Sequence, residues 1–180
     1  MIGDSIMHWA GIRAERMGRA NLRLPSHKTI SWLTLRGMKW QNFHHVVQRE
    51  RLFHASPEVI VVHLGGNDLR TWSLYKLRRV INKELKYLHE CFPGTKIIWY
   101  DILQRVTWGG DYELNVAIEK KRRRVNGFGR KAVEPFGMVI SADIDYQTKG
   151  FYRKDGIHLS DVGLEMFLDT LRDGIIKCLG

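Results

Sequence analysis

Three side chains near opposite ends of the chain could together perform nucleophilic catalysis. Ser5 lies near the start of the 180-residue sequence, and Asp155 and His158 lie near its end. A serine hydroxyl becomes a nucleophile at neutral pH only when a base removes its proton, and a histidine base needs an acid to fix its tautomer. Asp155 and His158 are three residues apart in a turn that contains Gly156, so the carboxylate can bond one imidazole nitrogen while the other faces away.

The elements that must position these residues are predicted to be parallel strands joined by helices. Short apolar runs alternate with longer segments of helical period, which is typical of an α/β fold. The strongest strand is expected at 59–64, because this run is β-branched and nearly continuous, as in a strand buried on both faces. Further strands are predicted at 97–100, 138–140 and 30–35, with a stub at 1–2.

Two segments have the apolar spacing of amphipathic helices. In one of them, which ends near Pro93, apolar residues recur at steps of three and four at Leu74, Leu77, Ile81, Leu85 and Leu88. The other follows Ser160, a good N-cap, and its apolar residues are Leu164, Phe167, Leu168, Leu171 and Ile175. We find no repeat, linker or composition break, so residues 1–180 are predicted to form a single domain.

The polar residues of interest follow the ends of the predicted strands. Ligands of open parallel sheets bind beyond the carboxyl ends of the strands, where several loops converge. Ser5 follows the first strand, Gly37 the second and Asn67 the third. Asp155 and His158 lie between the last strand and the final helix, so we expect all five residues to gather at one rim of the sheet.

Four short blocks resemble those of the SGNH (GDSL) hydrolase superfamily, in order and at suitable intervals. They are Gly3-Asp4-Ser5, Gly37, Gly65-Gly66-Asn67-Asp68 and Asp155-Gly156-Ile157-His158. This resemblance covers nearly the whole chain and implies a flavodoxin-like three-layer α/β/α sandwich around a five-stranded parallel sheet. It also implies a serine hydrolase of the esterase, lipase or deacetylase type, which acts on a small-molecule or lipid ester through an acyl-enzyme without a cofactor or metal.

The same resemblance assigns a role to each residue of the predicted site. Ser5 is the nucleophile, His158 is the general base and then the general acid, and Asp155 orients His158. The backbone N–H groups of Ser5 and Gly37 and the side-chain amide of Asn67 are the expected oxyanion donors.

A finer resemblance concerns three longer strings. Residues 35–40, 63–69 and 155–160 are similar to the SGNH-type domains encoded by animal mobile elements, particularly retroelements. This resemblance implies that the natural protein extends beyond the present chain, next to a neighbour that handles nucleic acid.

Other interpretations exist for the acidic residues and for the serine. Asp4 and Asp68 could bind a metal together with His158, as in a hydrolytic nuclease, but no HxH pattern or carboxylate cluster supports this. Both aspartates are instead expected to brace loops through backbone hydrogen bonds. Ser5 taken alone could be an unreactive helix N-cap.

Most of the histidines and tryptophans are expected to be structural. His63 is predicted to lie in the core, whereas the predicted surface histidines are His44, His45 and His54. The six tryptophans should mostly be buried, although an apolar acyl or aromatic pocket could be lined by Trp40, Trp72 and Trp108. Residues 105–108 and the following Gly109-Gly110 are predicted to form one wall of the site.

The positive charge suggests a second function. Lys and Arg number 29 and Asp and Glu number 19, so the formal net charge is +10. The densest basic run is predicted to be helical and consists of Lys120, Lys121, Arg122, Arg123 and Arg124. It either forms a solvated helix face or binds nucleic acid or an acidic membrane. The alternative function is therefore a catalytically weak SGNH-like module that binds through this face within a mobile-element protein.

The remaining composition constrains the setting. The two cysteines, Cys91 and Cys178, lie far apart without CxxC spacing, so neither a disulfide framework nor a thiolate zinc site is indicated. No basic segment followed by an apolar stretch opens the sequence, and no apolar run approaches the roughly 20 residues that span a bilayer. These features favour an intracellular, cytoplasmic protein.

Overall fold

The computed structural model describes residues 1–53 and 56–180, without the side chains of residues 52 and 53. His54 therefore falls outside the described residues. The backbone forms a five-stranded parallel sheet with the strand order β2-β1-β3-β4-β5. The strands are β1 (Ile2–Gly3), β2 (Leu33–Thr34), β3 (Val59–His63), β4 (Lys96–Tyr100) and β5 (Gly137–Ile140).

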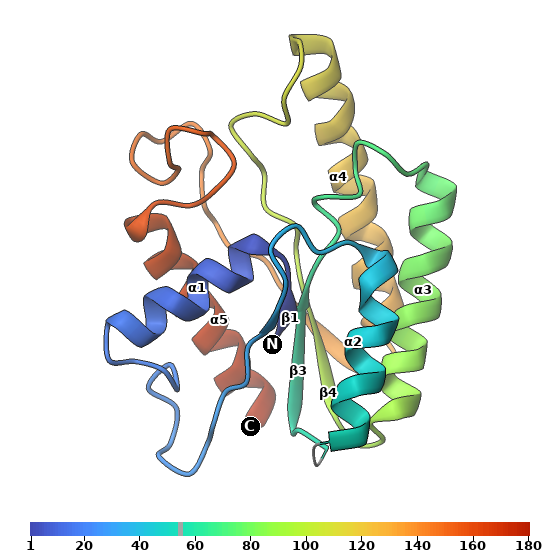
Figure 1. Cartoon of the computed structure of the whole chain (residues 1–180), viewed down its shortest axis with the longest axis vertical. Coiled ribbons are helices and arrows are strands. Elements are labelled where there is room, and N and C mark those ends of the chain that lie inside the picture. The colour runs from blue at the N-terminus through green and yellow to red at the C-terminus, as the bar shows by residue number, and fades with distance from the viewer. Residues whose placement is uncertain (54–55) are drawn as a thin grey trace.

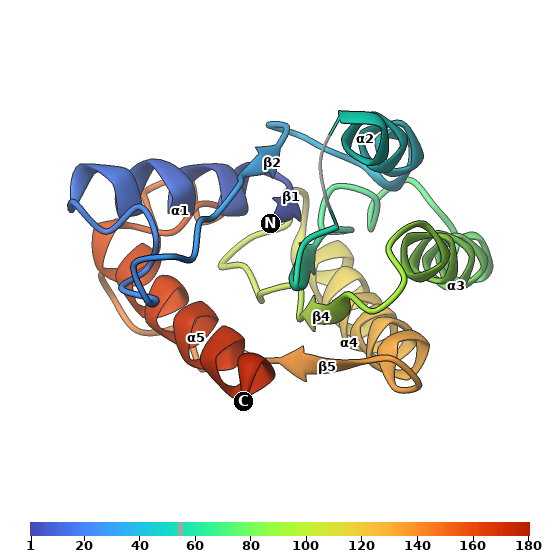
Figure 2. The ribbon, with the colours of Figure 1, turned by 90° about the horizontal axis from the view of Figure 1, so that it is seen from below.

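Five helices cover the two faces of this sheet. Helices α1 and α5 pack on one face and helices α2, α3 and α4 on the other, as Figures 1 and 2 show. The predicted three-layer α/β/α sandwich with a five-stranded parallel sheet is therefore confirmed. The helices are α1 (Ser5–Arg16), α2 (Trp40–Phe53), α3 (Leu74–Cys91), α4 (Tyr112–Val133) and α5 (Asp161–Leu179).

Alternation along the central strands builds both halves of the core. In β3, Val62 packs in the cluster beneath α2, α3 and α4, while Val61 packs in the cluster beneath α1 and α5. The neighbouring strand β4 divides Ile97 and Ile98 between the two clusters in the same way. Each of these side chains is buried, and full burial of one stabilises the fold by about 1.5–3 kcal/mol.

The second strand is shorter than predicted. The run 30–35 was expected to be extended, but only Leu33–Thr34 pairs with β1. Because β1 is only two residues long (Ile2–Gly3), the edge strand β2 can pair with it over only two residues. The side chain of Trp32 packs closely on Gly11 of α1 instead, so it contributes to the helix layer rather than to the ladder.

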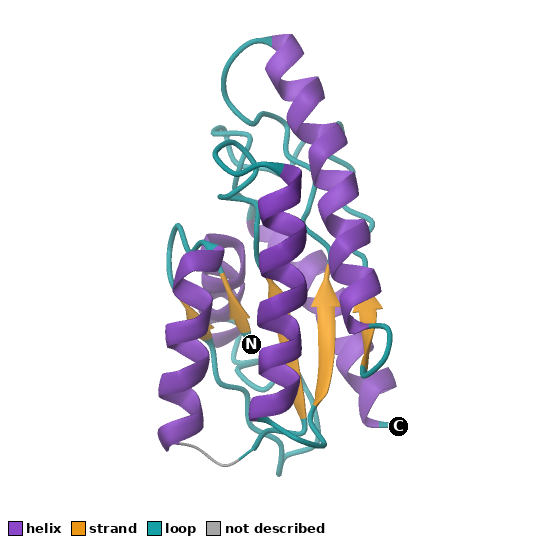
Figure 3. Cartoon of the chain, turned by 90° about the vertical axis from the view of Figure 1, so that its right-hand side faces the viewer, coloured by secondary structure: helices purple, strands orange, loops and turns teal. Residues whose placement is uncertain are grey.

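The helix boundaries follow from capping side chains. Ser160 accepts a hydrogen bond from Gly163 N at 3.1 Å, which confirms it as the N-cap of α5. Ser73 and Asp111 cap α3 and α4 in the same way. The first turns of α4 extend beyond the strand ends, as Figure 3 shows. Among the described helices, none combines the length and apolarity needed to cross a bilayer.

Candidate active site

Strand β1 and helix α1 present Ser5 at the carboxyl end of the sheet. Asp4 is the N-cap of α1, because its Oδ1 accepts a hydrogen bond from Ile6 N at 3.0 Å. The alternative that Ser5 is the cap is therefore wrong, since Ser5 is the first residue of the helix. A Cβ at Gly3 would lie 2.7 Å from Met7 Cβ, so only glycine fits at this tight strand-to-helix junction.

The turn before α5 brings an imidazole to this serine. His158 Nε2 lies 3.0 Å from Ser5 Oγ, and His158 Nδ1 lies 2.8 Å from Asp155 Oδ2. The three side chains predicted to meet thus form one continuous hydrogen-bonded chain. Ser5 is 8% exposed, whereas the side chains of His158 and Asp155 are 27% and 44% exposed, so the group opens to solvent on the imidazole side.

Asp155 is held in its ionised form. Partial burial alone would raise the pKa of Asp155, but hydrogen bonds from the backbone and ring of His158 and from Ile157 N outweigh it and lower the pKa to about 2. An ionised carboxylate only accepts hydrogen bonds, so the proton of a neutral His158 ring resides on Nδ1. The unprotonated Nε2 then faces Ser5 Oγ, as a general base requires.

The turn that carries these two residues is fixed by backbone bonds. Asp155 Oδ1 accepts hydrogen bonds from Ile157 N at 2.8 Å and from His158 N at 2.9 Å. Gly156 has a φ of +66°, a left-handed conformation that glycine adopts without strain. Arg153 N also donates to the carbonyl oxygen of His158 at 2.8 Å. The orientation of the imidazole is therefore set by the turn itself.

The predicted oxyanion donors lie in segments that the structure ties together. The side-chain amide of Asn67 donates to Met38 O at 3.1 Å and to Asp4 Oδ2 at 3.4 Å. Met38 follows Gly37, whose φ of +75° again favours glycine. Asn67 thus bridges the segment that contains Gly37 and the residue that precedes Ser5. The roles of the Ser5, Gly37 and Asn67 N–H groups in binding an oxyanion remain predictions.

The two aspartates of the alternative metal hypothesis brace loops, as expected. Asp4 caps α1, and Asp68 Oδ2 accepts a hydrogen bond from Trp40 N at 3.3 Å. Burial raises the pKa of Asp68 to about 6, and its Oδ1 is a buried atom without a hydrogen-bond partner. Within the described ranges, no three His, Cys, Asp or Glu side chains are gathered as ligands for a metal ion.

The predicted wall of the site packs against the turn that carries Asp155 and His158. Val106 N and Thr107 N both donate to Gly156 O, at 2.9 and 3.2 Å. The preceding Arg105 places its guanidinium 4.6 Å from the centroid of the Trp108 ring. The sequence indicated this wall but not the direction of the Arg105 side chain. The loop after β4 has no periodic pattern from which the direction of a side chain can be predicted.

The tryptophans proposed as alternative pocket linings are mainly structural. Trp40 is 1% exposed and stacks on Trp99, and Trp108 is also buried. Trp72 is half-buried beneath the ammonium group of Lys76, 3.8 Å from its ring centroid. An apolar pocket built from exposed indole rings is therefore not found at these positions.

The histidines outside the turn follow their predictions in part. His63 is buried between the rings of Tyr100 and Phe167, and burial lowers its pKa, so it is a core residue as expected. His45 is exposed. His44 is half-buried rather than freely exposed, because its ring bonds the buried carboxylate of Glu84 at 3.0 Å.

The basic run of α4 does not form a single face. Five consecutive helical residues point in all directions around the axis, since 3.6 residues complete a turn. Lys121 Nζ donates to Leu69 O at 2.6 Å, and Arg122 binds Glu119 and Ile102 O. The exposed members of the run are Lys120, Arg123 and Arg124. Binding of nucleic acid or acidic membrane by these residues stays a prediction, with a smaller surface than the sequence suggested.

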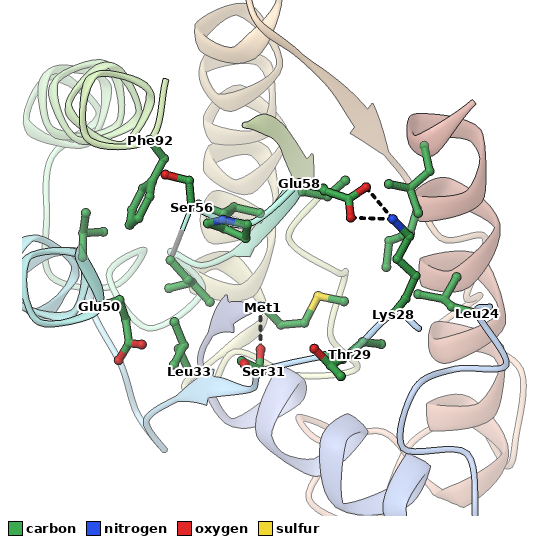
Figure 4. A pocket seen from close by; sticks show the side chains of 18 of the residues that line it. Met1, Leu24, Lys28, Thr29, Ser31, Leu33, Glu50, Ser56, Glu58 and Phe92 are labelled. Carbon is green, nitrogen blue, oxygen red and sulfur yellow. Dashed lines mark hydrogen bonds and ion pairs between the residues drawn. The ribbon is translucent and has the colours of Figure 1, made fainter. Parts of the chain in front are cut away.

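A cavity of about 430 Å³ lies at the other end of the sheet. It opens at the amino ends of β1 and β3, where the Met1 amine donates to Ser31 O at 2.7 Å, as Figure 4 shows. An ion pair between Lys28 and Glu58 crosses one side of it. None of the residues predicted to be catalytic lines this cavity.

Comparisons with known proteins agree with the fold. No protein-family model and no curated protein sequence matches the chain. A GDSL-like lipase from Bacteroides thetaiotaomicron superposes with a TM-score of 0.70 at 16% identity, over 98% of this chain and 86% of that one. A carbohydrate esterase family 3 protein from Talaromyces cellulolyticus gives 0.65 at 16% identity, over 98% and 95% of the two chains.

A psychrotrophic esterase from Pseudoalteromonas gives a TM-score of 0.70 at 13% identity, over 99% of this chain and 97% of that one. These structural neighbours are thus a GDSL-like lipase and two esterases, and the chain shares their fold, as the resemblance of its motifs implied. The finer likeness to mobile-element domains stays a prediction.

Proposed function

We propose that the protein is a serine hydrolase that cleaves a carboxylic ester through an acyl-enzyme on Ser5. The observation that carries this proposal is the 3.0 Å contact between Ser5 Oγ and His158 Nε2, with Asp155 on the opposite ring nitrogen. Hydrogen-bond reach between a nucleophile and a base that a third group orients is the arrangement on which serine catalysis depends. The fold shared with esterases and lipases supports the same reaction class.

In the first half of the proposed reaction, the base activates the serine. His158 Nε2 accepts the hydroxyl proton of Ser5 while Oγ bonds to the ester carbonyl carbon. The carbonyl oxygen becomes an oxyanion, which the N–H groups of Ser5, Gly37 and Asn67 are proposed to stabilise. Asp155 retains its hydrogen bond to Nδ1 and stabilises the imidazolium that forms.

The second half restores the enzyme. The tetrahedral intermediate collapses as its carbon–oxygen bond to the leaving alcohol breaks, and His158 gives its proton to that alcohol. Water then attacks the acyl group on Ser5, and His158 accepts a proton from the water. The bond between the acyl carbon and Ser5 Oγ then breaks, His158 gives its proton to Oγ, and the carboxylic acid leaves. The proposed steps require no metal or organic cofactor.

Two measurements test the proposal. Turnover of 4-nitrophenyl acetate should be lost in Ser5→Ala and in His158→Ala, while the exposed controls Ser141→Ala and His45→Ala keep it. A fluorophosphonate probe should form an adduct that mass spectrometry locates on Ser5. Equal turnover by the wild type, Ser5→Ala and His158→Ala would contradict the proposal, as would a probe adduct elsewhere.

A further inference from the structure

The guanidinium of Arg105 lies between the segments that carry the nucleophile and the Asn67 amide. A Cβ built on Gly66 would lie 2.8 Å from Arg105 Nη2 and 3.7 Å from Asp4 Oδ2. Gly66 precedes Asn67, and Asp4 precedes Ser5. The two residues after Arg105 donate backbone hydrogen bonds to Gly156 O, so the backbone that carries this side chain is joined to the turn of Asp155 and His158.

Among the described residues, no carboxylate bonds this guanidinium directly. In the part of the chain that the structure describes, its N–H groups make no hydrogen bond and no ion pair, and its Cζ lies 4.6 Å from the centroid of the Trp108 ring. Burial lowers the pKa of Arg105, while the negative charges of Asp4 and Asp155 oppose that change. Both carboxylates already serve other groups, since Asp4 caps α1 and Asp155 holds His158.

Other arginines of the chain form the direct ion pairs that Arg105 lacks among the described residues. Arg13 bonds Asp161 and Glu165, and Arg130 bonds Asp101 through two of its nitrogens. A charge that is partly removed from water is costly unless an opposite charge or hydrogen-bond acceptors compensate it, and Arg105 is half-buried. Arginine is also the side chain best suited to bidentate binding of a carboxylate or a phosphate. The guanidinium N–H groups of Arg105 are therefore suited to binding an anion that is not part of the chain.

Three more arginines border the same rim without an ion pair in the described ranges. Arg36 and Arg153 lie over the Trp9 ring, 5.6 and 4.6 Å from its centroid, and Arg70 Nη1 donates to Trp108 O at 3.3 Å. These residues come from the segments that also carry Gly37, His158 and Asn67. The approach to the site is thus lined by positive charge.

We infer that the ester hydrolysed at this site carries an anionic group, a carboxylate or a phosphate, and that Arg105 binds this group. The inference rests on the proposed function, because it names the substrate class of the same site. Arg36, Arg70 and Arg153 attract the substrate, whereas Arg105 makes the direct contact. The anionic group lies on either the acyl side or the alcohol side of the ester, and the experiment below separates these two cases.

The test compares charged esters with neutral esters of matched shape. On the acyl side, mono(4-nitrophenyl) succinate is compared with its methyl ester, and on the alcohol side 4-acetoxybenzoate is compared with its methyl ester. For one of these pairs, the wild type should have the larger kcat/KM with the charged ester. In Arg105→Ala the ratio of charged to neutral kcat/KM should fall about 30-fold, as expected for loss of a charge-assisted hydrogen bond.

Two further variants separate recognition from structure. Arg105→Lys should keep part of the preference, because it retains the charge but not the planar fork. Arg16→Ala removes an exposed arginine of α1 and should leave the ratio unchanged. If Arg105→Ala lowers kcat/KM equally for charged and neutral esters, Arg105 only positions its loop and the inference is overturned. A wild type that favours the neutral ester in both pairs overturns it too.

A binding measurement keeps this inference distinct from the proposed reaction. Succinate and methylphosphonate are titrated by calorimetry into Ser5→Ala, which does not depend on turnover. Binding that is lost when Arg105→Ala is added supports the anion site even if the wild type hydrolyses no ester. Binding that is absent, or equal with and without Arg105, overturns the inference whatever the outcome of the activity assays.

Discussion

At the scale of single residues, the proposed oxyanion role of Asn67 would compete with the hydrogen bonds that its amide already makes. Its amide nitrogen carries two hydrogens, and both are directed to protein acceptors, Met38 O at 3.1 Å and Asp4 Oδ2 at 3.4 Å. The longer bond to Asp4 is the weaker of the two, so it can be exchanged for an oxyanion at small cost. The contact with Met38 O would then keep the amide in place during the reaction.

Replacing Asn67 by alanine tests this duty. If its amide stabilises the oxyanion, Asn67→Ala should lower kcat about 100- to 1,000-fold and change KM little. Steady-state kinetics with 4-nitrophenyl acetate measures both constants, and Asn82→Ala on the exposed side of α3 is the control. A kcat equal to that of the wild type would exclude the donor role, and a thermal melt shows whether the lost Met38 contact has weakened the fold.

Asp68 should make stability depend on pH. Its pKa is 3.8 in the absence of structure and about 6 in the fold, so between these values the folded protein binds more protons than the unfolded chain. The contribution of Asp68 to the unfolding free energy is therefore fully present below about pH 4 and is lost as the pH rises through about 6.

Asp68→Asn removes this titration while keeping an oxygen for Trp40 N. From about pH 4 to about pH 7, the unfolding free energy of the variant should rise relative to the wild type by about 2 kcal/mol. Urea denaturation at both pH values measures the difference, and the exposed Asp143→Asn serves as the control. Parallel curves for wild type and Asp68→Asn would refute the expectation.

At the scale of elements, helix α4 approaches strand β4 through a glycine. A Cβ at Gly129 would lie 2.1 Å from Trp99 Cε2, and this indole cannot shift easily because it is fully buried and donates from Nε1 to Asp101 Oδ1 at 3.1 Å. Gly127, two residues earlier in the same helix, has open space where its Cβ would be. A side chain is therefore excluded at Gly129 by packing, whereas one could be accommodated at Gly127.

Alanine substitutions at these two glycines should change stability in opposite directions. Gly129→Ala should lower the unfolding free energy by about 2–3 kcal/mol through overpacking against Trp99. Gly127→Ala should raise it by up to about 1 kcal/mol, since alanine favours the helix and meets no neighbour. Thermal or urea unfolding measures the free energy of unfolding of both variants. Equal effects would contradict the view that Gly129 is needed for the close packing of α4 on β4.

The fold was largely predictable, because it depends on patterns that the sequence displays directly. The strand predicted at 59–64 is β3 (Val59–His63), and the helix predicted to end near Pro93 is α3, which ends at Cys91. The length of β2 was wrong, since an edge strand is limited by its neighbour rather than by its own composition. The turn of Asp155 and His158 was predictable from its glycine and its spacing.

Other parts of the site could not be read from the sequence. A dense basic run looks like one surface in the sequence, whereas the helix turns Lys121 and Arg122 inward to Leu69 O and Ile102 O. Arg105 is similarly one of many arginines in the sequence. The role that we infer for it rests on its place beside Gly66 and on the lack of a direct ion pair among the described residues, and both depend on tertiary packing.

At the scale of the whole molecule, a formal charge of +10 acts with the arginines around the rim. Such a field raises the encounter rate of anionic substrates, and salt screens it. The Debye length falls from roughly 30 Å at about 10 mM salt to roughly 3 Å at about 1 M. Kinetics at low and high salt therefore report whether this charge serves the reaction.

We expect kcat/KM for the preferred charged ester to fall several-fold across this salt range, and kcat/KM for its methyl ester to change much less. Stopped-flow or plate assays in sodium chloride measure both substrates under the same conditions. If salt affects the charged and the neutral ester equally, the net charge does not steer substrates and has some other role.

The hydrogen bond between Ser5 and His158 joins positions that are 153 residues apart in the chain. During synthesis, the imidazole partner is added 153 residues after the alcohol, and helix α5, which follows the imidazole, is added later still. Any chemistry that needs both groups stays switched off in a nascent or truncated polypeptide. Esterase activity would thus report that the two ends of the domain have folded together. The same assay would show whether two separately expressed halves of the chain reassemble.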